Sequence, residues 1–144
     1  MSSVNEEYPT HVFSLLGSAL TVAKRLMEAE ISGEPHRLRG SHLRLLSLTP
    51  AEGIRPTELA ARVGMTKQSL GEFVAALQEA GYLQVEADEH DRRARIVSPT
   101  DKGLRLQRRI LETFADTEER WRQAVGPRNW TTFRKVLNQL ADEK

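Results

Sequence analysis

Cysteine is absent from this 144-residue chain, which excludes disulfide bonds, thiol nucleophiles and redox sensing through a thiol. The chain also lacks a strong excess of positive or negative charge, since it has 21 Lys and Arg against 20 Asp and Glu and a formal net charge of +1. Composition alone therefore does not indicate a nucleic-acid partner. No apolar run approaches the roughly 20 residues that span a membrane, and the N-terminus lacks the basic and apolar segments of a signal peptide. We expect a cytoplasmic protein without a membrane partner.

The sequence also lacks the patterns typical of metal sites and enzymes. Its four histidines, His11, His36, His42 and His90, show no spacing that would place two ligands on one helix face. There is no glycine-rich phosphate loop and no local nucleophile–base pair. We expect no metal, no cofactor and no enzymatic activity. A metal-dependent protein, the alternative, would carry bound metal after purification without a chelator.

Aromatic residues are few, with two Trp, two Tyr and four Phe, and most of them lie in the terminal segments. A small domain does not cover so much apolar surface alone, and exposed apolar patches mark interfaces. We therefore predict that the terminal segments contact a second copy of the chain. The alternative, which the sequence leaves open, is that they fold back into a monomeric core. The residues concerned are Phe13, Phe114, Trp121, Trp130 and Phe133.

Apolar residues recur every three or four positions in both halves of the chain, which is the period of a helix. Breaks at Ser32–Pro35 and at Gly126-Pro127 separate the periodic segments. Residues 1–9 are expected to form a frayed start. We predict helices over Thr10–Glu30, Ser41–Leu48, Thr100–Val125 (with Thr100 as N-cap) and Arg128–Ala141, the long one with an apolar stripe of Leu104, Ile110, Leu111, Phe114, Trp121 and Val125.

The centre of the chain carries the most specific pattern. Pro56–Val63 forms a short helix with proline at its first position, and Gly64 supplies a tight turn. Thr66 is an N-cap for a second helix that ends at Gly81. Two short helices joined by a glycine turn, the second with a polar N-terminal face, are the signature of a helix-turn-helix. The second helix is predicted to face Leu70, Phe73, Val74 and Leu77 inward and Lys67, Gln68, Gly71 and Glu72 outward.

A charged hairpin follows the two helices. Residues 82–87 alternate apolar and polar as a half-buried strand does, residues 88–93 form a charged tip, and residues 94–98 return as a second strand that ends before Pro99. Three of the nine cations of residues 37–95, namely Arg92, Arg93 and Arg95, crowd this hairpin. A helix-turn-helix followed by a basic hairpin is a winged helix, so the predicted fold class is mainly α with a small β-wing.

These segments resemble the MarR family of bacterial transcription regulators over nearly the whole chain. The resemblance implies a homodimeric, sequence-specific DNA-binding regulator, a repressor released by a small, often aromatic ligand. It also implies a dimer formed by the terminal helices, whose interface would include Val12 together with the aromatic residues above. The chain would then be a single interlocked domain with an N-terminal dimerisation helix in 1–36, the winged helix-turn-helix in 37–98 and C-terminal dimerisation helices in 99–144. The matching residues are Glu58-Leu59-Ala60, Thr66-Lys67-Gln68, Leu77 with Gly81, Asp88-Glu89-His90-Asp91-Arg92-Arg93 and Thr100-Asp101-Lys102-Gly103.

The resemblance also assigns contacts with the major groove. The first turn of the second helix would read bases and phosphates through Thr66, Lys67, Gln68 and Ser69. Gln68 can pair with adenine, and Lys67 with guanine or with a phosphate. Thr66 and Ser69 suit phosphates.

At the wing, the resemblance places Arg93 in the minor groove. Asp91 would hold this arginine by an ion pair, while Arg92 and Arg95 would bind phosphates. A charge run alone usually marks a solvated turn, and the adjacent helix-turn-helix is what favours DNA contact here.

Glu72 and Val85 depart from the family, in which basic residues are common at both positions. A carboxylate repels phosphate, although it can accept a hydrogen bond from cytosine N4. Glu72 either specifies a cytosine or pairs with a nearby arginine outside the contact surface, and we favour the second. Together with the small net charge, these departures leave open a second function, a winged-helix protein-interaction module that has lost DNA binding.

Overall fold

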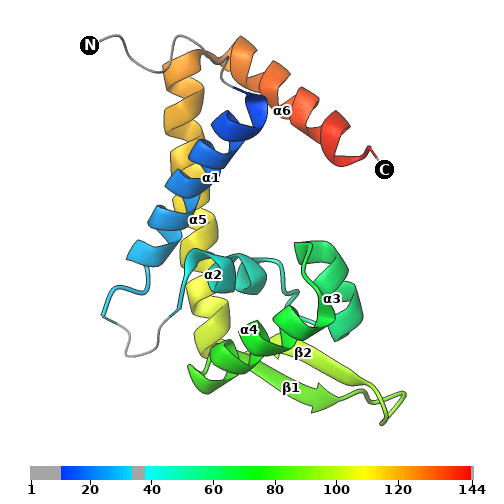
Figure 1. The fold of residues 1–144 in the computed structure, drawn as a ribbon. Helices are drawn as coiled ribbons and strands as arrows, with labels where there is room; N and C mark the ends of the chain where they lie inside the picture. Colours follow the sequence, from blue (N-terminus) through cyan, green and yellow to red (C-terminus); the bar gives the residue numbers. More distant parts are fainter. Residues whose placement is uncertain (1–10, 34–37, 144) are drawn as a thin grey trace, which may run out of the picture. The chain divides into compact units, whose positions relative to one another are not determined.

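The computed structural model describes residues 11–33 and 38–143. Within them lie six helices and a two-stranded antiparallel sheet (Figure 1), which confirms the predicted fold class. The chain divides into two compact units, Met1–Ile110 (unit 1) and Leu111–Lys144 (unit 2), and each is described by itself. The predicted frayed start at residues 1–9 and the break at Pro35 lie outside the described residues.

The observed helices and strands agree with the predicted ones to within two residues at every end. Thr66 and Thr100 precede the helices that they were predicted to begin, and glycines follow α3 and separate α5 from α6. The elements are α1 (Val12–Ala29), α2 (Gly40–Ser47), α3 (Pro56–Val63), α4 (Lys67–Glu79), β1 (Leu83–Ala87), β2 (Arg95–Pro99), α5 (Asp101–Val125) and α6 (Pro127–Ala141).

The wing strands pair in register from Leu83 opposite Pro99 to Ala87 opposite Arg95. The prediction that the return strand ends before Pro99 was wrong. Proline removes one donor from the ladder, but β2 is an edge strand of a two-stranded sheet, where this loss is tolerated. The N–H of Thr100 takes over and donates to the Tyr82 carbonyl oxygen at 3.1 Å.

The core of unit 1 is built from one face of each helix. The apolar residues of α4 that recur at three and four positions, Leu70, Val74 and Leu77, are buried as predicted, and α4 packs on α2, α3 and β1. Phe73, which was also predicted to face inward, is only half-buried; its ring packs edge-to-face with that of His42, with centroids 4.5 Å apart. Other core residues are Met27, Ile31, Leu43, Leu45, Leu46, Ile54, Leu59, Val63, Tyr82, Leu83 and Val97.

The first turns of α5 complete this core. Leu106, which the predicted apolar stripe left out, is fully buried together with Ile110, four residues further on. The side-chain amide of Gln107 donates to the carbonyl oxygens of Leu46 (2.9 Å) and Thr49 (2.8 Å). These bonds cap the C-terminal end of α2, where carbonyl groups lack partners within the helix, and they join the first turns of α5 to α2.

Unit 2 consists of the rest of α5 and of α6, joined at Gly126 with a left-handed φ of 92°. Its aromatic residues touch one another: the ring centroids of Trp121 and Trp130 are 6.3 Å apart, and those of Trp130 and Phe133 are 5.5 Å apart. None of the apolar side chains described in this unit is buried. A single copy of the chain therefore leaves the apolar faces of unit 2 uncovered.

Gly103, at the start of α5, offers a test of this packing. A Cβ atom at residue 103 would overlap the Tyr82 carbonyl oxygen, so Gly103→Ala should destabilise the protein by about 1–3 kcal/mol, the usual cost of overpacking. Gly17→Ala is the matched control, because nothing lies within 4 Å of a Cβ there. Alanine should stabilise that helix by up to about 1 kcal/mol. Urea unfolding measures both; equal stabilities would contradict the packing at Gly103.

Candidate nucleic-acid interface

The turn between α3 and α4 sets the start of α4. Gly64 ends α3 with a left-handed φ of 74°, a conformation that glycine adopts without strain. The N–H of Met65 then donates to the Ala60 carbonyl oxygen (3.0 Å). Thr66 is the N-cap, since its Oγ1 accepts a hydrogen bond from the N–H of Ser69 at 3.1 Å. Both the turn and the cap were predicted.

The first turn of α4 presents the predicted contact residues to solvent. Lys67, Gln68 and the cap Thr66 are exposed, and Ser69 is half-buried. Gly71, further along this face, has open space around the position of a Cβ. Free N–H groups and the positive end of the helix dipole favour an anion at such a helix start, so this surface can accept phosphate and offers amide, hydroxyl and ammonium groups for bases.

Glu72 is exposed and lies at an open cavity of about 160 Å³ that it lines with Arg39, His42 and Phe73. Among the residues that the structure describes, no ion pair joins Glu72 to an arginine. The preferred interpretation of Glu72, a carboxylate held by a neighbouring cation, therefore has no support in these contacts. Its charge is open to solvent on the same helix as the predicted DNA contacts.

His42 contributes a neutral ring beside Glu72. Its Nδ1 accepts a hydrogen bond from the backbone N–H of Arg39 at 3.0 Å. Burial, and then the charge of Arg39, lower the pKa of His42 below its ordinary value. The imidazole is therefore uncharged at neutral pH and does not offset the carboxylate of Glu72.

The wing tip is held by aspartate side chains that bind the backbone. Asp88 Oδ1 accepts the N–H of His90 at 2.9 Å, and Asp91 Oδ1 accepts the N–H of Arg93 at 3.1 Å. The tip closes where the N–H of Asp88 donates to the Ala94 carbonyl oxygen (3.0 Å). Among the described ion pairs, none joins Asp91 to the Arg93 guanidinium as predicted; Asp91 instead binds the backbone N–H two residues on, as aspartates in turns commonly do.

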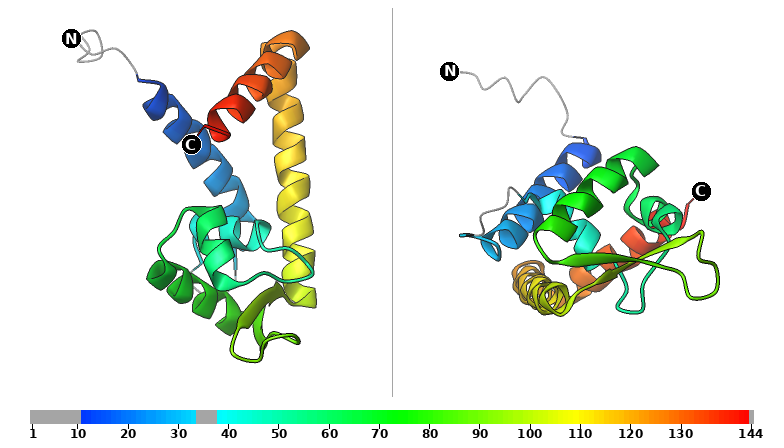
Figure 2. Two further views of the ribbon diagram at one scale, coloured as in Figure 1. Left: turned by 90° about the vertical axis from the view of Figure 1, so that its right-hand side faces the viewer. Right: turned by 90° about the horizontal axis from the view of Figure 1, so that it is seen from below.

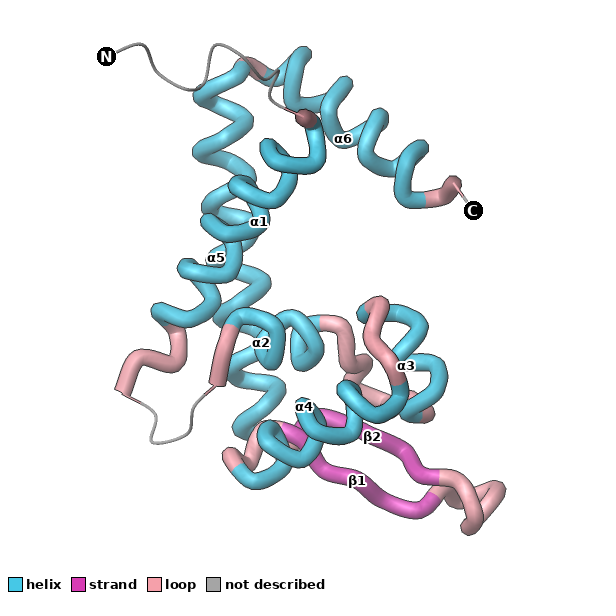
Figure 3. Tube along the Cα trace, in the orientation of Figure 1, coloured by secondary structure: helices cyan, strands magenta, loops and turns pink. Residues whose placement is uncertain are grey.

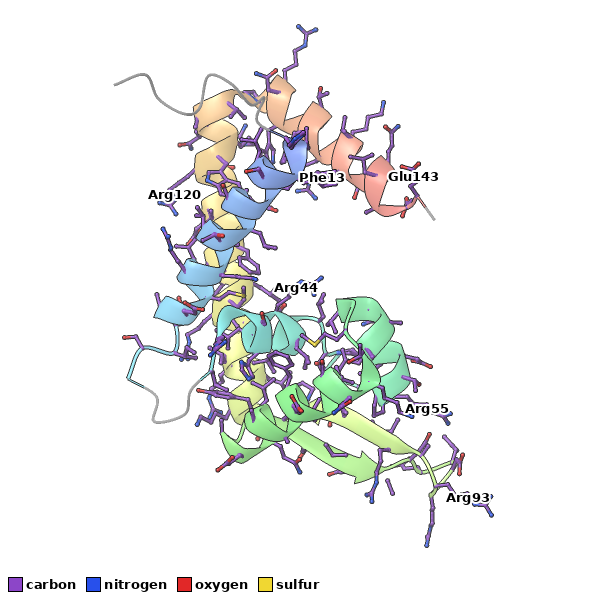
Figure 4. The ribbon with its side chains drawn as sticks, viewed as in Figure 1. Phe13, Arg44, Arg55, Arg93, Arg120 and Glu143 are labelled. Carbon is purple, nitrogen blue, oxygen red and sulfur yellow. The ribbon has the colours of Figure 1, made fainter. Side chains whose placement is uncertain are left out.

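The three arginines of the wing, Arg92, Arg93 and Arg95, are all exposed. Arg95 begins β2 opposite Ala87, and Figure 4 shows Arg93 on the loop with its side chain directed away from the strands. This loop projects beyond the ends of α3 and α4 (Figures 2 and 3). The wing can thus carry cationic side chains to a surface that the helices do not reach.

Arg55 is a wing-contacting residue that the sequence did not reveal. It is the N-cap of α3 and makes no side-chain capping bond. Instead its Nη2 lies 3.0 Å from Asp88 Oδ2. The hydrogen bond from His90, then the one from Arg55, lower the pKa of Asp88. No spacing rule connects positions 33 residues apart, so no signal in the sequence indicates this pair.

The residues predicted for a dimer interface lie in both units. Val12 and Phe13 are 63% and 85% exposed at the start of α1, where Figure 4 labels Phe13. Phe133 is exposed, and Phe114, Trp121 and Trp130 are half-buried. The pairing of two chains thus stays a prediction, and these apolar surfaces are available for it.

Within the described residues, no group of three His, Cys, Asp or Glu side chains is placed to hold a metal ion. In the same part of the chain, no helix combines the length and apolar character needed to cross a membrane.

Known proteins share both the sequence pattern and the fold. Residues 38–94 match the model of the MarR family. The HTH-type transcriptional regulator PetP of Rhodobacter capsulatus is 29% identical over 104 residues, which are 72% of this chain and 63% of PetP. The match thus spans less than two thirds of that relative's length.

Two solved structures show the same architecture. PcaV from Streptomyces coelicolor, in complex with its natural ligand, is 23% identical with a TM-score of 0.68, over 92% of this chain and 93% of PcaV. The repressor CouR, bound to a 23-mer DNA duplex, is 24% identical with a TM-score of 0.69, over 98% of this chain and 96% of CouR. The segment from residue 38 to residue 94, which holds the helix-turn-helix and the first strand and tip of the wing, is thus similar to the MarR family, and the whole chain shares the fold of these solved structures.

Proposed function

We propose that the protein is a homodimeric, sequence-specific DNA-binding regulator of transcription, acting in the cytoplasm as a repressor. The observation that carries this proposal is the pairing, in unit 1, of an exposed polar first turn of α4 with a projecting wing that bears three arginines. A small net charge does not oppose it, since charge acts through its placement at the contact surface. The DNA duplex bound to CouR supports the proposal by analogy of fold.

The proposed contacts divide between bases and backbone. Gln68 reads adenine, and Lys67 reads guanine or binds phosphate. Thr66 and Ser69 bind phosphates at the helix start. In a two-fold dimer, two such helices enter successive major grooves about 34–36 Å apart, so the operator is expected to be a pseudo-palindrome.

Dimerisation is proposed from the apolar side chains that one chain leaves uncovered. On α1 these include Val12, Phe13 and Leu15, and on α6 they include Phe133 and Leu140, each at least 41% exposed. Exposed apolar patches of this kind mark interfaces. A second copy of the chain would cover these side chains and would also supply the second α4 helix for DNA.

A small aromatic ligand is proposed to release the DNA. PcaV is described with its natural ligand, and CouR from Rhodococcus jostii RHA1 with p-coumaroyl-CoA. Such a ligand would bind more tightly to a form of the dimer in which the spacing of the two α4 helices does not suit DNA. It would then weaken DNA binding by as much as its own affinity differs between the two forms.

Selection of bound sequences from a random duplex library tests the proposed function directly. We expect a pseudo-palindromic operator whose binding weakens steeply with salt, because each phosphate contact releases counterions. The open carboxylate of Glu72 favours the second candidate, a protein-interaction module without DNA binding. Absence of any enriched sequence, with no salt-dependent binding to duplex, would select that candidate instead.

Arg93 and Arg92 of the wing are expected to differ in how they affect DNA binding. Arg93→Ala should weaken operator binding by about 1–3 kcal/mol, with the main loss of preference at A·T-rich flanks, because arginine in the minor groove senses groove width and potential. Arg92→Ala should cost a more uniform amount and reduce the salt slope by about one. Titrations against flank variants at several salt concentrations separate the two; wild-type binding by Arg93→Ala would remove the wing from the interface.

Replacing Glu72 tests the open charge on α4. If it repels the DNA backbone, Glu72→Ala should strengthen binding to all duplexes alike, and we expect this result. If it accepts from cytosine N4, the same change should relax preference at one base pair by about 1–3 kcal/mol. Affinities for the operator and for single-base variants distinguish the two outcomes.

Phe13 provides the sharpest test of the dimer, because its side chain is 85% exposed in one chain. Phe13→Glu should yield monomers with unchanged helix content, since burying an unpaired carboxylate costs several kcal/mol. Ser14→Glu, at an exposed neighbouring position, is the control for added charge. Light scattering at micromolar concentration gives the mass; a monomeric wild type would overturn the dimer.

A further inference from the structure

Three consecutive residues before α3 attach the wing to the helices. A Cβ atom at Gly53 would overlap the side chain of Ile96, and Gly53 has a φ of 95°. Ile54 exchanges both backbone hydrogen bonds with Val97, each 2.9 Å long. Ile54, between Gly53 and Arg55, thus joins β2 through an isolated antiparallel bridge.

Arg55 forms the outermost of these attachments. Its guanidinium reaches Asp88, the first residue after β1, whose backbone N–H closes the tip by donating to Ala94. The Asp88 side chain is only 13% exposed, whereas that of Arg55 is 47% exposed. Figure 4 labels Arg55 and Arg93 at the same end of unit 1. The pair therefore clamps the root of the loop that carries the DNA-contacting arginines.

We propose that Arg55 is a positioning residue for the wing, which through Asp88 fixes the loop from which Arg93 reaches the minor groove. The proposal rests on the proposed function for its DNA readout. The bridge between Ile54 and Val97 joins β2 to the segment before α3. Among the described hydrogen bonds and ion pairs, the loop beyond Ala87 and Arg95 is joined to the start of α3 through Arg55 and Asp88 alone. Arg55 supplies that tie.

The role of this pair is orientation rather than stability. The Arg55 side chain is about half exposed to solvent, and an ion pair with such an exposed partner contributes little to folding, so removing this one should leave thermal unfolding nearly unchanged. If the loop visits several positions, the apparent affinity for DNA is the intrinsic affinity multiplied by the fraction of time that the loop spends in the competent position. Loss of the tie should therefore appear in DNA preference and in loop protection.

Asp88→Asn is the variant that isolates the tie. An asparagine Oδ1 still accepts the N–H of His90, whereas its amide nitrogen cannot accept from Arg55. Arg55→Ala removes the other partner. Arg108→Ala, an exposed arginine on α5, controls for the loss of one positive charge.

Hydrogen exchange of the free protein and affinity for operators with altered A·T flanks form the two measurements. Arg55→Ala and Asp88→Asn should each speed exchange of the Asp88 and Ala94 amides. Each should also weaken binding by roughly fivefold, as expected when the competent fraction of the loop falls to about one fifth, with reduced flank preference. The double variant should lose no more than either single one, and Arg108→Ala should keep wild-type flank preference.

Two results would overturn the inference. In the first, Arg55→Ala lowers affinity evenly and reduces the salt slope by about one, while Asp88→Asn binds more tightly; Arg55 is then a phosphate contact. In the second, amide exchange and flank preference both stay at wild-type values. A wild-type protein that shows no duplex preference would instead refute the proposed function, and the exchange measurement would still decide whether Arg55 holds the loop.

Discussion

Burial of one face of α4 is the constraint on which the proposed contact surface depends. Leu70, Val74 and Leu77 are at most 7% exposed, and each fully buried side chain of this kind contributes about 1.5–3 kcal/mol. A helix buries only one stripe at a time, so the polar residues on the opposite side must face solvent. The orientation of Lys67 and Gln68 thus follows from the apolar contacts behind them.

Exposed acidic and basic side chains both lie on unit 1 near this surface. Exposed carboxylates such as Glu72 and Glu86 lie on the same unit as the cationic wing, and some acidic side chains are used for local structure. Asp88 and Asp91 bind backbone N–H groups of the tip. Their charges lie where they shape the loop, and among the described residues no carboxylate forms an ion pair with the guanidinium groups of the wing.

The two units differ in how they satisfy their apolar residues. Unit 1 has a core of its own, whereas the described part of unit 2 buries no apolar side chain and relies on aromatic contacts such as Trp121 with Trp130. Glu118 and Arg134 approach to 3.7 Å between α5 and α6, an exposed pair that contributes little. The apolar faces of unit 2 are consistent with the proposed partner chain, whose contacts would complete them.

The sequence by itself determined the elements and their ends, because helix period, caps and glycine turns act within a few residues. Thr66 and Gly64 are examples, since the bonds they make or permit join neighbours. Only the tertiary structure decided which side chains meet across the chain. Burial of Leu106, the edge contact of Phe73 with His42 and the pairing of Arg55 with Asp88 depend on how distant segments pack, and no local pattern encodes that packing.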